Sequence, residues 1–222
     1  MKHLALTTTA ALLLLPSIGH AAASCAEIQA RHPGARDDTY RLRLGPHKVE
    51  VYCHDMAGTP REYLTLPKTG QTTNYSYYGR GPNTAPAGLT TWYQKVRFNP
   101  ADLTLDLSDT TFAIRQGWAS FGPTRIESVP LASAGDCVAN DSRTGRSNID
   151  LTGTPFGIEP GQFQTSGFNP SGTATSKGSQ IVNLRGGGYC GNIGAPDNLL
   201  QLTFRTAPPR GPHGRQRTQP RG

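Results

Sequence analysis

The sequence predicts an all-β protein, with an antiparallel β-sandwich or barrel-like body, one short N-terminal helix and two disulfides. Short runs in which apolar and polar residues alternate indicate strands with one buried face. The 222 residues include 26 glycines and 18 prolines, a composition that favours many turns. Four cysteines follow an export signal, which is the pattern of a disulfide-bonded secreted domain.

Residues 1–23 have the pattern of a signal peptide. Lys2 supplies positive charge, an apolar stretch covers residues 4–15, and small residues permit cleavage after Ala21 or Ala23. This stretch is shorter than the roughly 20 apolar residues of a membrane-spanning helix, and no later run is long enough either. We therefore expect a secreted protein, extracellular or periplasmic, with no transmembrane segment.

One short helix is predicted at the start of the mature chain. Ser24 and Glu27 have the spacing of a capping box, in which each side chain satisfies a backbone N–H of the first turn. Ile28 continues an apolar face, and Pro33 and Gly34 end the helix.

Alternating runs predict the strands. Two hairpins are expected, from residues 40–44 with 49–53 around Gly45-Pro46, and from residues 95–98 with 103–107 around Asn99-Pro100-Ala101-Asp102. Proline at the second position favours a type I turn in the latter. Further strands are expected at residues 63–66, 111–114, 126–131, 149–151, 181–184 and 200–204.

Three segments lack this alternation. Residues 79–88 and 161–179 are rich in small and polar residues, so we predict surface loops. Residues 205–222 combine prolines with five arginines and no acid, which predicts a disordered basic tail. The folded domain is therefore expected to cover residues 24–204.

The four cysteines allow three disulfide pairings. Chain order, and a first hairpin that returns Cys53 towards the helix, favour Cys25–Cys53 and Cys137–Cys190. Each bond closes a loop worth about 3.5–4 kcal/mol in the chain-entropy account. An acylated Cys25 is the alternative, although no large aliphatic residue stands three positions before it. Because a cysteine opens and closes each half, an internal duplication is a second interpretation beside one continuous fold.

The net charge of +7 belongs mostly to the chain ends. Without Lys2 and the tail arginines, 16 of the 22 basic residues remain, against 15 acidic residues. A nearly neutral core gives no support to a nucleic-acid groove, which needs clustered lysine and arginine.

Several short segments follow one another in a recognisable order. They are SCAEIQ (24–29), VYCHDM (51–56), PREYLTLP (60–67), AGLTT (87–91), KVR (95–97), VPLASAGDC (129–137), IDLTGTPF (149–156) and GGYCG (187–191). This ordered set spans nearly the whole mature core. It resembles the GON domain, a module at the C-terminal end of some secreted ADAMTS-type metalloproteases.

The resemblance implies a secreted, non-catalytic binding or accessory module, here as a free-standing protein, that engages an extracellular protein or polysaccharide. Zinc and metalloendopeptidase activity enter only by association with the family. The family pattern is richer in cysteine, and Ala85 and Ile193 stand where cysteines are expected. Its disulfide framework therefore does not transfer as a set.

The sequence lacks a complete catalytic motif. A zincin needs His-Glu-x-x-His, which is absent, and the core histidines are His32, His47 and His54. A hydrolase assembled from the scattered residues His54, Asp136 and Asp150 is the alternative. It requires these groups to converge within about 3–4 Å in one pocket.

No cofactor is predicted. Asp136, Asn140, Asp141 and Ser142 carry oxygens that suit calcium, but their spacing is not that of an EF-hand, and a solvated turn is the simpler interpretation. The glycine-rich residues 186–191 lack the lysine and hydroxyl of a P-loop. We interpret them as a tight turn that lets Cys190 reach its partner.

An aromatic cluster gives the candidate ligand contacts, Tyr75, Tyr77, Tyr78 and Trp92. Exposed rings can stack on sugars or contact a protein, whereas buried rings only fill the core. Tyr75 and Tyr77 share one strand face and Tyr78 takes the other, so part of the cluster is expected at the surface. All three interpretations remain open at this point.

Overall fold

The computed structural model describes residues 21–79, 88–121, 124–138 and 143–205. Predictions for most of the signal peptide, for the tail beyond residue 205, and for Asn140, Asp141 and Ser142 fall outside these ranges. The described residues form a mostly β structure with one α-helix, which confirms the predicted fold class. None of the helices in these ranges is long and apolar enough to cross a membrane.

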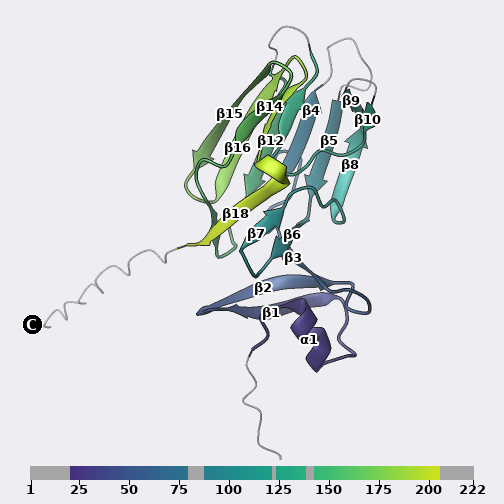
Figure 1. Cartoon of the computed structure of the whole chain (residues 1–222), viewed down its shortest axis with the longest axis vertical. Helices are drawn as coiled ribbons and strands as arrows, with labels where there is room; N and C mark the ends of the chain where they lie inside the picture. The colour runs from purple at the N-terminus through teal and green to yellow at the C-terminus, as the bar shows by residue number, and fades with distance from the viewer. Residues whose placement is uncertain (1–20, 80–87, 122–123, 139–142, 206–222) are drawn as a thin grey trace, which may run out of the picture.

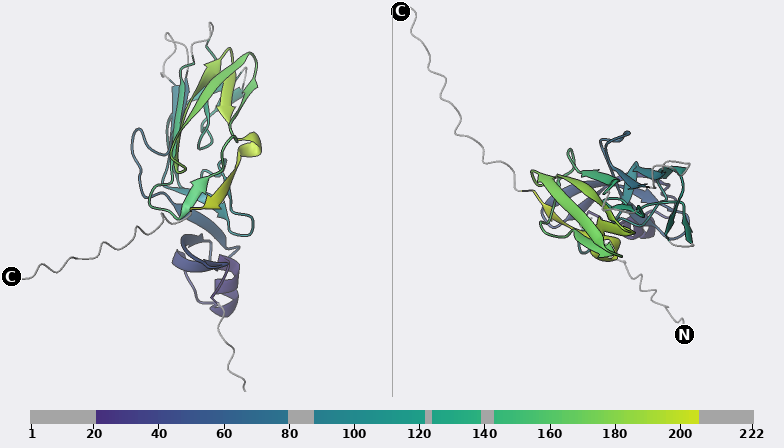
Figure 2. Two further views of the ribbon diagram at one scale, coloured as in Figure 1. Left: turned by 90° about the vertical axis from the view of Figure 1, so that its left-hand side faces the viewer. Right: turned by 90° about the horizontal axis from the view of Figure 1, so that it is seen from above.

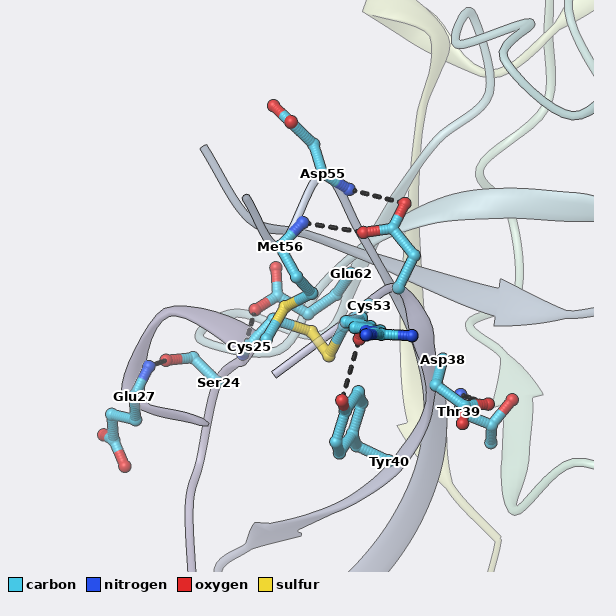
Figure 3. Close-up of a disulfide and its surroundings, with 12 residues drawn as sticks. Ser24, Cys25, Glu27, Asp38, Thr39, Tyr40, Cys53, Asp55, Met56 and Glu62 are labelled. Atoms are coloured by element: carbon cyan, nitrogen blue, oxygen red, sulfur yellow. Dashed lines mark hydrogen bonds between the residues drawn. A yellow bond between two sulfur atoms is a disulfide. The ribbon is translucent and has the colours of Figure 1, made fainter. Parts of the chain in front are cut away.

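Helix α1 (Cys25–Arg31) is fixed to the neighbouring sheet by covalent and polar contacts. The Ser24 side chain accepts a hydrogen bond from the Glu27 N–H at 3.1 Å, as the capping box predicts. A disulfide joins Cys25 to Cys53, and the buried carboxylate of Glu62 accepts from the Cys25 N–H at 2.7 Å (Figure 3). A carboxylate is stabilising there because the helix N-terminus carries partial positive charge.

The lower part of the molecule is a curved antiparallel sheet that forms a half-barrel (Figure 1). Among the described residues it has seven strands, in the order β1 (Asp38–Leu44), β2 (His47–His54), β3 (Arg61–Thr65), β6 (Lys95–Asn99), β7 (Thr104–Asp106), β18 (Leu199–Phe204) and β13 (Phe156–Ile158). The predicted hairpins are β1–β2 and β6–β7. Their inward residues, such as Leu42, Val49 and Phe98, are fully buried.

The upper part is a second sheet that curls into a nearly closed barrel (Figures 1 and 2). Its described strands run in the order β14 (Gln164–Gly167), β17 (Gly191–Gly194), β11 (Ala134–Asp136), β4 (Tyr75–Gly79), β12 (Gly145–Asp150), β16 (Ile181–Gly188) and β15 (Pro170–Lys177). Beyond the other edge of β4 lie β5 (Gly88–Tyr93) and β8 (Ala113–Gly117). A small hairpin, β9 (Ala119–Phe121) with β10 (Thr124–Ile126), and the 3₁₀-helix η1 (Pro196–Asn198) complete the described elements.

Both sheets combine strands from the two halves of the chain. The C-terminal β18 pairs with β7, and β12 pairs with β4. This interleaving fits one continuous fold and does not fit two tandem repeats. The second disulfide joins Cys137 to Cys190, so both predicted pairings are confirmed, and an acylated Cys25 is ruled out in this structure by its bond to Cys53.

Three sequence predictions about strands were wrong. Residues 161–179 are not a loop, because β14 and β15 lie there; both are exposed edge strands whose polar side chains give no apolar alternation. Residues 126–131 are not a strand beyond Ile126, although Val129 and Leu131 are buried. Pro130 has no N–H to donate to a neighbouring strand, so this segment is irregular. Leu103 has a positive φ of 59° and belongs to the turn before β7.

Glycines allow the upper barrel to close. β11 lies so near β12 and β16 that a Cβ on Gly145 would come within 3.0 Å of Gly135 and Gly186 backbone atoms. A Cβ on Gly186 would likewise meet the Ala134 carbonyl oxygen. The glycine run that ends at Gly188 therefore does more than prepare the turn to Cys190, because its first residue permits backbone-to-backbone packing.

We expect Gly145→Ala to destabilise the protein by about 3 kcal/mol, because the new methyl group has only backbone to displace. Urea unfolding followed by circular dichroism measures this loss. Gly34→Ala is the matched control, since its Cβ would meet nothing within 4 Å, and its effect should stay within about 0.5 kcal/mol. Equal stability of the two variants would contradict the close packing described above.

Candidate ligand-binding face

The outer face of the upper sheet presents two rows of side chains that cross its strands. Because residues opposite each other in a ladder point to the same face, the pairing registers define each row. The first row is Thr173, Arg185, Arg146, Tyr77, Thr90 and Gln116. The second row is Thr175, Asn183, Asn148, Tyr75, Trp92 and Ile114. These rows, called the outer face below, extend about 24 Å from β15 to β8 at about 4.8 Å per strand.

Three of the four aromatic residues singled out by sequence lie on this face. Tyr75 and Trp92 stand opposite each other on β4 and β5, and both are partly exposed. The Trp92 indole N–H donates to the Gln71 carbonyl at 3.3 Å, which fixes the ring. The Tyr77 ring lies over Gly88, where a Cβ would contact the ring at 2.6 Å.

Tyr78 does not belong to the outer face. Its side chain points inward, is 6% exposed, and packs with Leu89, Ala119 and Val129. Burial raises the pKa of its hydroxyl to about 12. Tyr78 is therefore a core residue, as the alternation along β4 predicts.

Two arginines on this face were not identified from the sequence. Arg146 of β12 and Arg185 of β16 are direct cross-strand neighbours, and Tyr77 flanks Arg146 on the other side. Burial raises the pKa of Tyr75 and of Tyr77, while the positive charge of Arg146 acts in the opposite direction. The sequence holds no signal for this group, because its members come from three strands distant in the chain.

A buried polar network supports the aromatic end of the outer face. Asn74, which has a positive φ of 52°, is fully buried just before β4. Its side chain donates to the Asp150 carbonyl at 3.0 Å and accepts from the Asp150 N–H at 2.8 Å, while its N–H donates to Asn148 at 3.1 Å. This network fixes β4 against β12 immediately beside Tyr75.

The residues of the alternative hydrolase site do not converge. Asp136 and Asp150 lie at opposite ends of β12. Asp136 accepts hydrogen bonds from Thr144, which precedes the first residue of this strand, whereas Asp150 is its last residue. The five-residue interval spans about 17 Å. His54 lies in the lower sheet, where it contacts Asp37 at 2.8 Å. The backbone N–H groups of Met56 and Asp55 donate to the Asp37 carboxylate and, with His54, lower its pKa. The contact between His54 and Asp37 therefore belongs to the turn that follows β2.

The structure also separates the histidines. His47 and His54 stand at opposite ends of β2, about 24 Å apart for seven residues of strand, so they cannot share one metal ion. The His47 ring stacks on Phe204, with 3.7 Å between ring centroids. Within the described ranges, no group of three or more metal-ligating side chains assembles.

A second aromatic cluster, on the lower sheet, was also missed. Phe112 packs edge-on against Tyr52, His54 and Tyr63, with ring centroids 4.8–5.5 Å apart. Lys95 lies over the Tyr52 ring at 4.7 Å. Tyr63 is only 1% exposed, so this cluster serves mainly to pack the loop before β8 onto the half-barrel.

Comparison with known proteins agrees with the resemblance found in the sequence. The family model described as GON domain matches residues 22–82 and 79–204. A human protein, "A disintegrin and metalloproteinase with thrombospondin motifs 20", is 28% identical over 197 residues, which covers 76% of this chain. The chain spans about 10% of that protein's length. No solved structure matches this chain.

We expect Asn74→Ala to destabilise the protein by about 3 kcal/mol, because it leaves the Asp150 N–H and the Asp150 carbonyl buried without their partner. Asn183→Ala is the control. Asn183 is exposed and accepts one hydrogen bond, from Asn148, so its loss should cost under about 1 kcal/mol. Thermal and urea unfolding compare the two variants, and similar losses would exclude Asn74 as the support of β4.

Proposed function

Since this chain belongs to the GON domain family, a module of ADAMTS proteases, we propose that it is a secreted, non-catalytic binding module whose outer face engages an extracellular polysaccharide. The observation that carries this proposal is the placement of Tyr75 and Trp92 side by side on the solvent-facing side of the upper sheet. Partly exposed aromatic rings offer stacking area to the apolar faces of sugar rings.

The polar groups around these rings suit a polysaccharide. Both rows consist largely of hydroxyl and amide side chains, such as Thr90, Gln116 and Asn183, which both donate and accept hydrogen bonds. These groups stand on strands rather than on loops, so they need no rearrangement before a ligand binds. An extended polymer can lie along the rows and contact several strands at once.

Protein is the other partner class that the family resemblance leaves open, and the outer face supports it less. Its area is roughly 300 Å², from about 24 Å across the strands and about 14 Å along them. A stable protein interface buries about 800 Å² on each partner and has an apolar centre. Ile114 is the aliphatic residue of the two rows, and it lies at their end.

Secretion is part of the same proposal. Two disulfides are typical of proteins in oxidising compartments, and the first residues have the pattern of a signal peptide. The separation of His54, Asp136 and Asp150 supports a binding role over a hydrolase, because general acid–base catalysis needs such groups within hydrogen-bond reach of one substrate.

Polysaccharide and glycan arrays test the proposal. We expect the double variant Tyr75→Thr/Trp92→Thr to lose at least about ten-fold in binding, since about 1.4 kcal/mol of stacking corresponds to that factor. Threonine retains strand propensity and already occupies neighbouring positions of the rows. Circular dichroism and thermal unfolding establish that the variant is folded.

Phe168→Ala/Tyr189→Ala is the matched control. Phe168 follows β14 and Tyr189 follows β16, and their side chains are 66% and 48% exposed. The centroids of the two rings lie 5.6 Å apart. Their removal deletes two surface aromatics outside the outer face, so binding should change less than about two-fold. If the control variant loses binding while the threonine variant keeps it, or if neither variant binds any glycan, the outer face is not the specific binding site.

A further inference from the structure

Arg146 and Arg185 form a like-charged pair on the outer face. They are opposite each other in the β12–β16 ladder, where like charges destabilise a sheet. Arg146 is partly buried and Arg185 is exposed. The direct opposition of two like charges weakens the sheet, so its presence next to the aromatic residues points to a use outside folding.

The pair is held in place by backbone rather than by acidic side chains. The Arg143 carbonyl accepts from Arg146 Nη1 at 2.6 Å and from Arg185 Nε at 3.3 Å, and the Gly145 carbonyl accepts from Arg146 at 2.8 Å. Both guanidinium groups are therefore directed to one place. An arginine carries five N–H donors, so each keeps donors for a ligand.

Within the part of the chain that the structure describes, no acidic side chain pairs with either arginine. Neither row contains a carboxylate. The two carboxylates of β11 and β12 are buried and have other partners: Asp136 accepts from Thr144, and Asp150, at the far end of β12, contacts Lys68 at 3.5 Å. The positive charge at this end of the outer face is thus available to an anion.

We propose that Arg146 and Arg185 bind the acidic group, sulfate or carboxylate, of an anionic polysaccharide whose sugar rings stack on Tyr75, Tyr77 and Trp92. This inference rests on the proposed function and names its substrate class. Arginine suits oxyanions because its planar N–H donors match two oxygens at once. Tyr77 is the register neighbour of Arg146, so charge and stacking surface meet on adjacent strands.

Three polymers that share one backbone test the inference: dextran sulfate, carboxymethyl dextran and unmodified dextran. Binding of the full-length protein is measured by biolayer interferometry at several salt concentrations. We expect the two charged polymers to bind at least ten-fold more tightly than dextran, with affinity falling as salt rises. The preferred charged polymer distinguishes sulfate from carboxylate as the bound group.

The test variant is Arg146→Gln/Arg185→Gln, which we expect to lose at least ten-fold in binding to the preferred charged polymer. The variant loses the hydrogen bonds to the Arg143 and Gly145 carbonyls together with the like-charge repulsion, so circular dichroism and thermal unfolding first establish that it is folded. A loss of binding in a folded variant cannot be attributed to misfolding. Arg146→Lys/Arg185→Lys keeps the charge and should recover only part of the binding.

Arg43→Gln/Lys48→Gln is the control, because Arg43 and Lys48 are also cross-strand neighbours of like charge, on β1 and β2. It removes the same net charge away from the aromatic residues and should change binding less than two-fold. Equal losses in both glutamine variants, or none in either, would overturn the inference and assign binding to general charge such as the arginine-rich C-terminal residues. Binding to neutral glycans that requires Tyr75 and Trp92 but not the arginines would overturn the inference alone and leave the proposed function intact.

Discussion

The close approach of β11 to β12 and β16 is the constraint on which the upper barrel depends. Gly135, Gly145 and Gly186 meet there with no side chains between them. Backbone packing at this distance lets one sheet curl back on itself, so that β17 and β14 extend it on the other side. The Cys137–Cys190 disulfide closes the same end covalently, at the turn between β16 and β17.

Curling has a direct consequence for the outer face. Inward positions such as Ser76, Thr91 and Ile149 are buried in the barrel, so the alternate residues of the same strands point to the outer face, where Tyr75, Trp92 and Arg146 are partly exposed. β4 and β12 contribute to both sides, and the buried Asn74 network fixes their register. A slip of one residue in either strand would send Tyr75 or Arg146 into the interior. The residues that hold the core together therefore also arrange the outer face.

The two ends of the molecule are stabilised in different ways. At the lower end, α1 covers the half-barrel through the Cys25–Cys53 disulfide, the capping Ser24 and the carboxylate of Glu62. At the upper end, glycine packing and the second disulfide act together. Arg146 and Arg185 stand in contrast to both, because their juxtaposition opposes folding and is tolerated within an otherwise well-satisfied sheet.

The sequence alone determined the local features: the helix and its cap, the β1–β2 and β6–β7 hairpins, both disulfide pairings, the family, and the opposite orientations of Tyr77 and Tyr78. These follow from periodicity, turn chemistry and ordered motifs, which act over a few residues or along the chain. Only the tertiary structure placed Trp92 beside Tyr75 and Arg185 beside Arg146, since strand order and register are set by contacts between distant segments. It also revealed β14 and β15, whose exposed polar strands are held by backbone pairing that leaves no mark in the hydrophobic pattern.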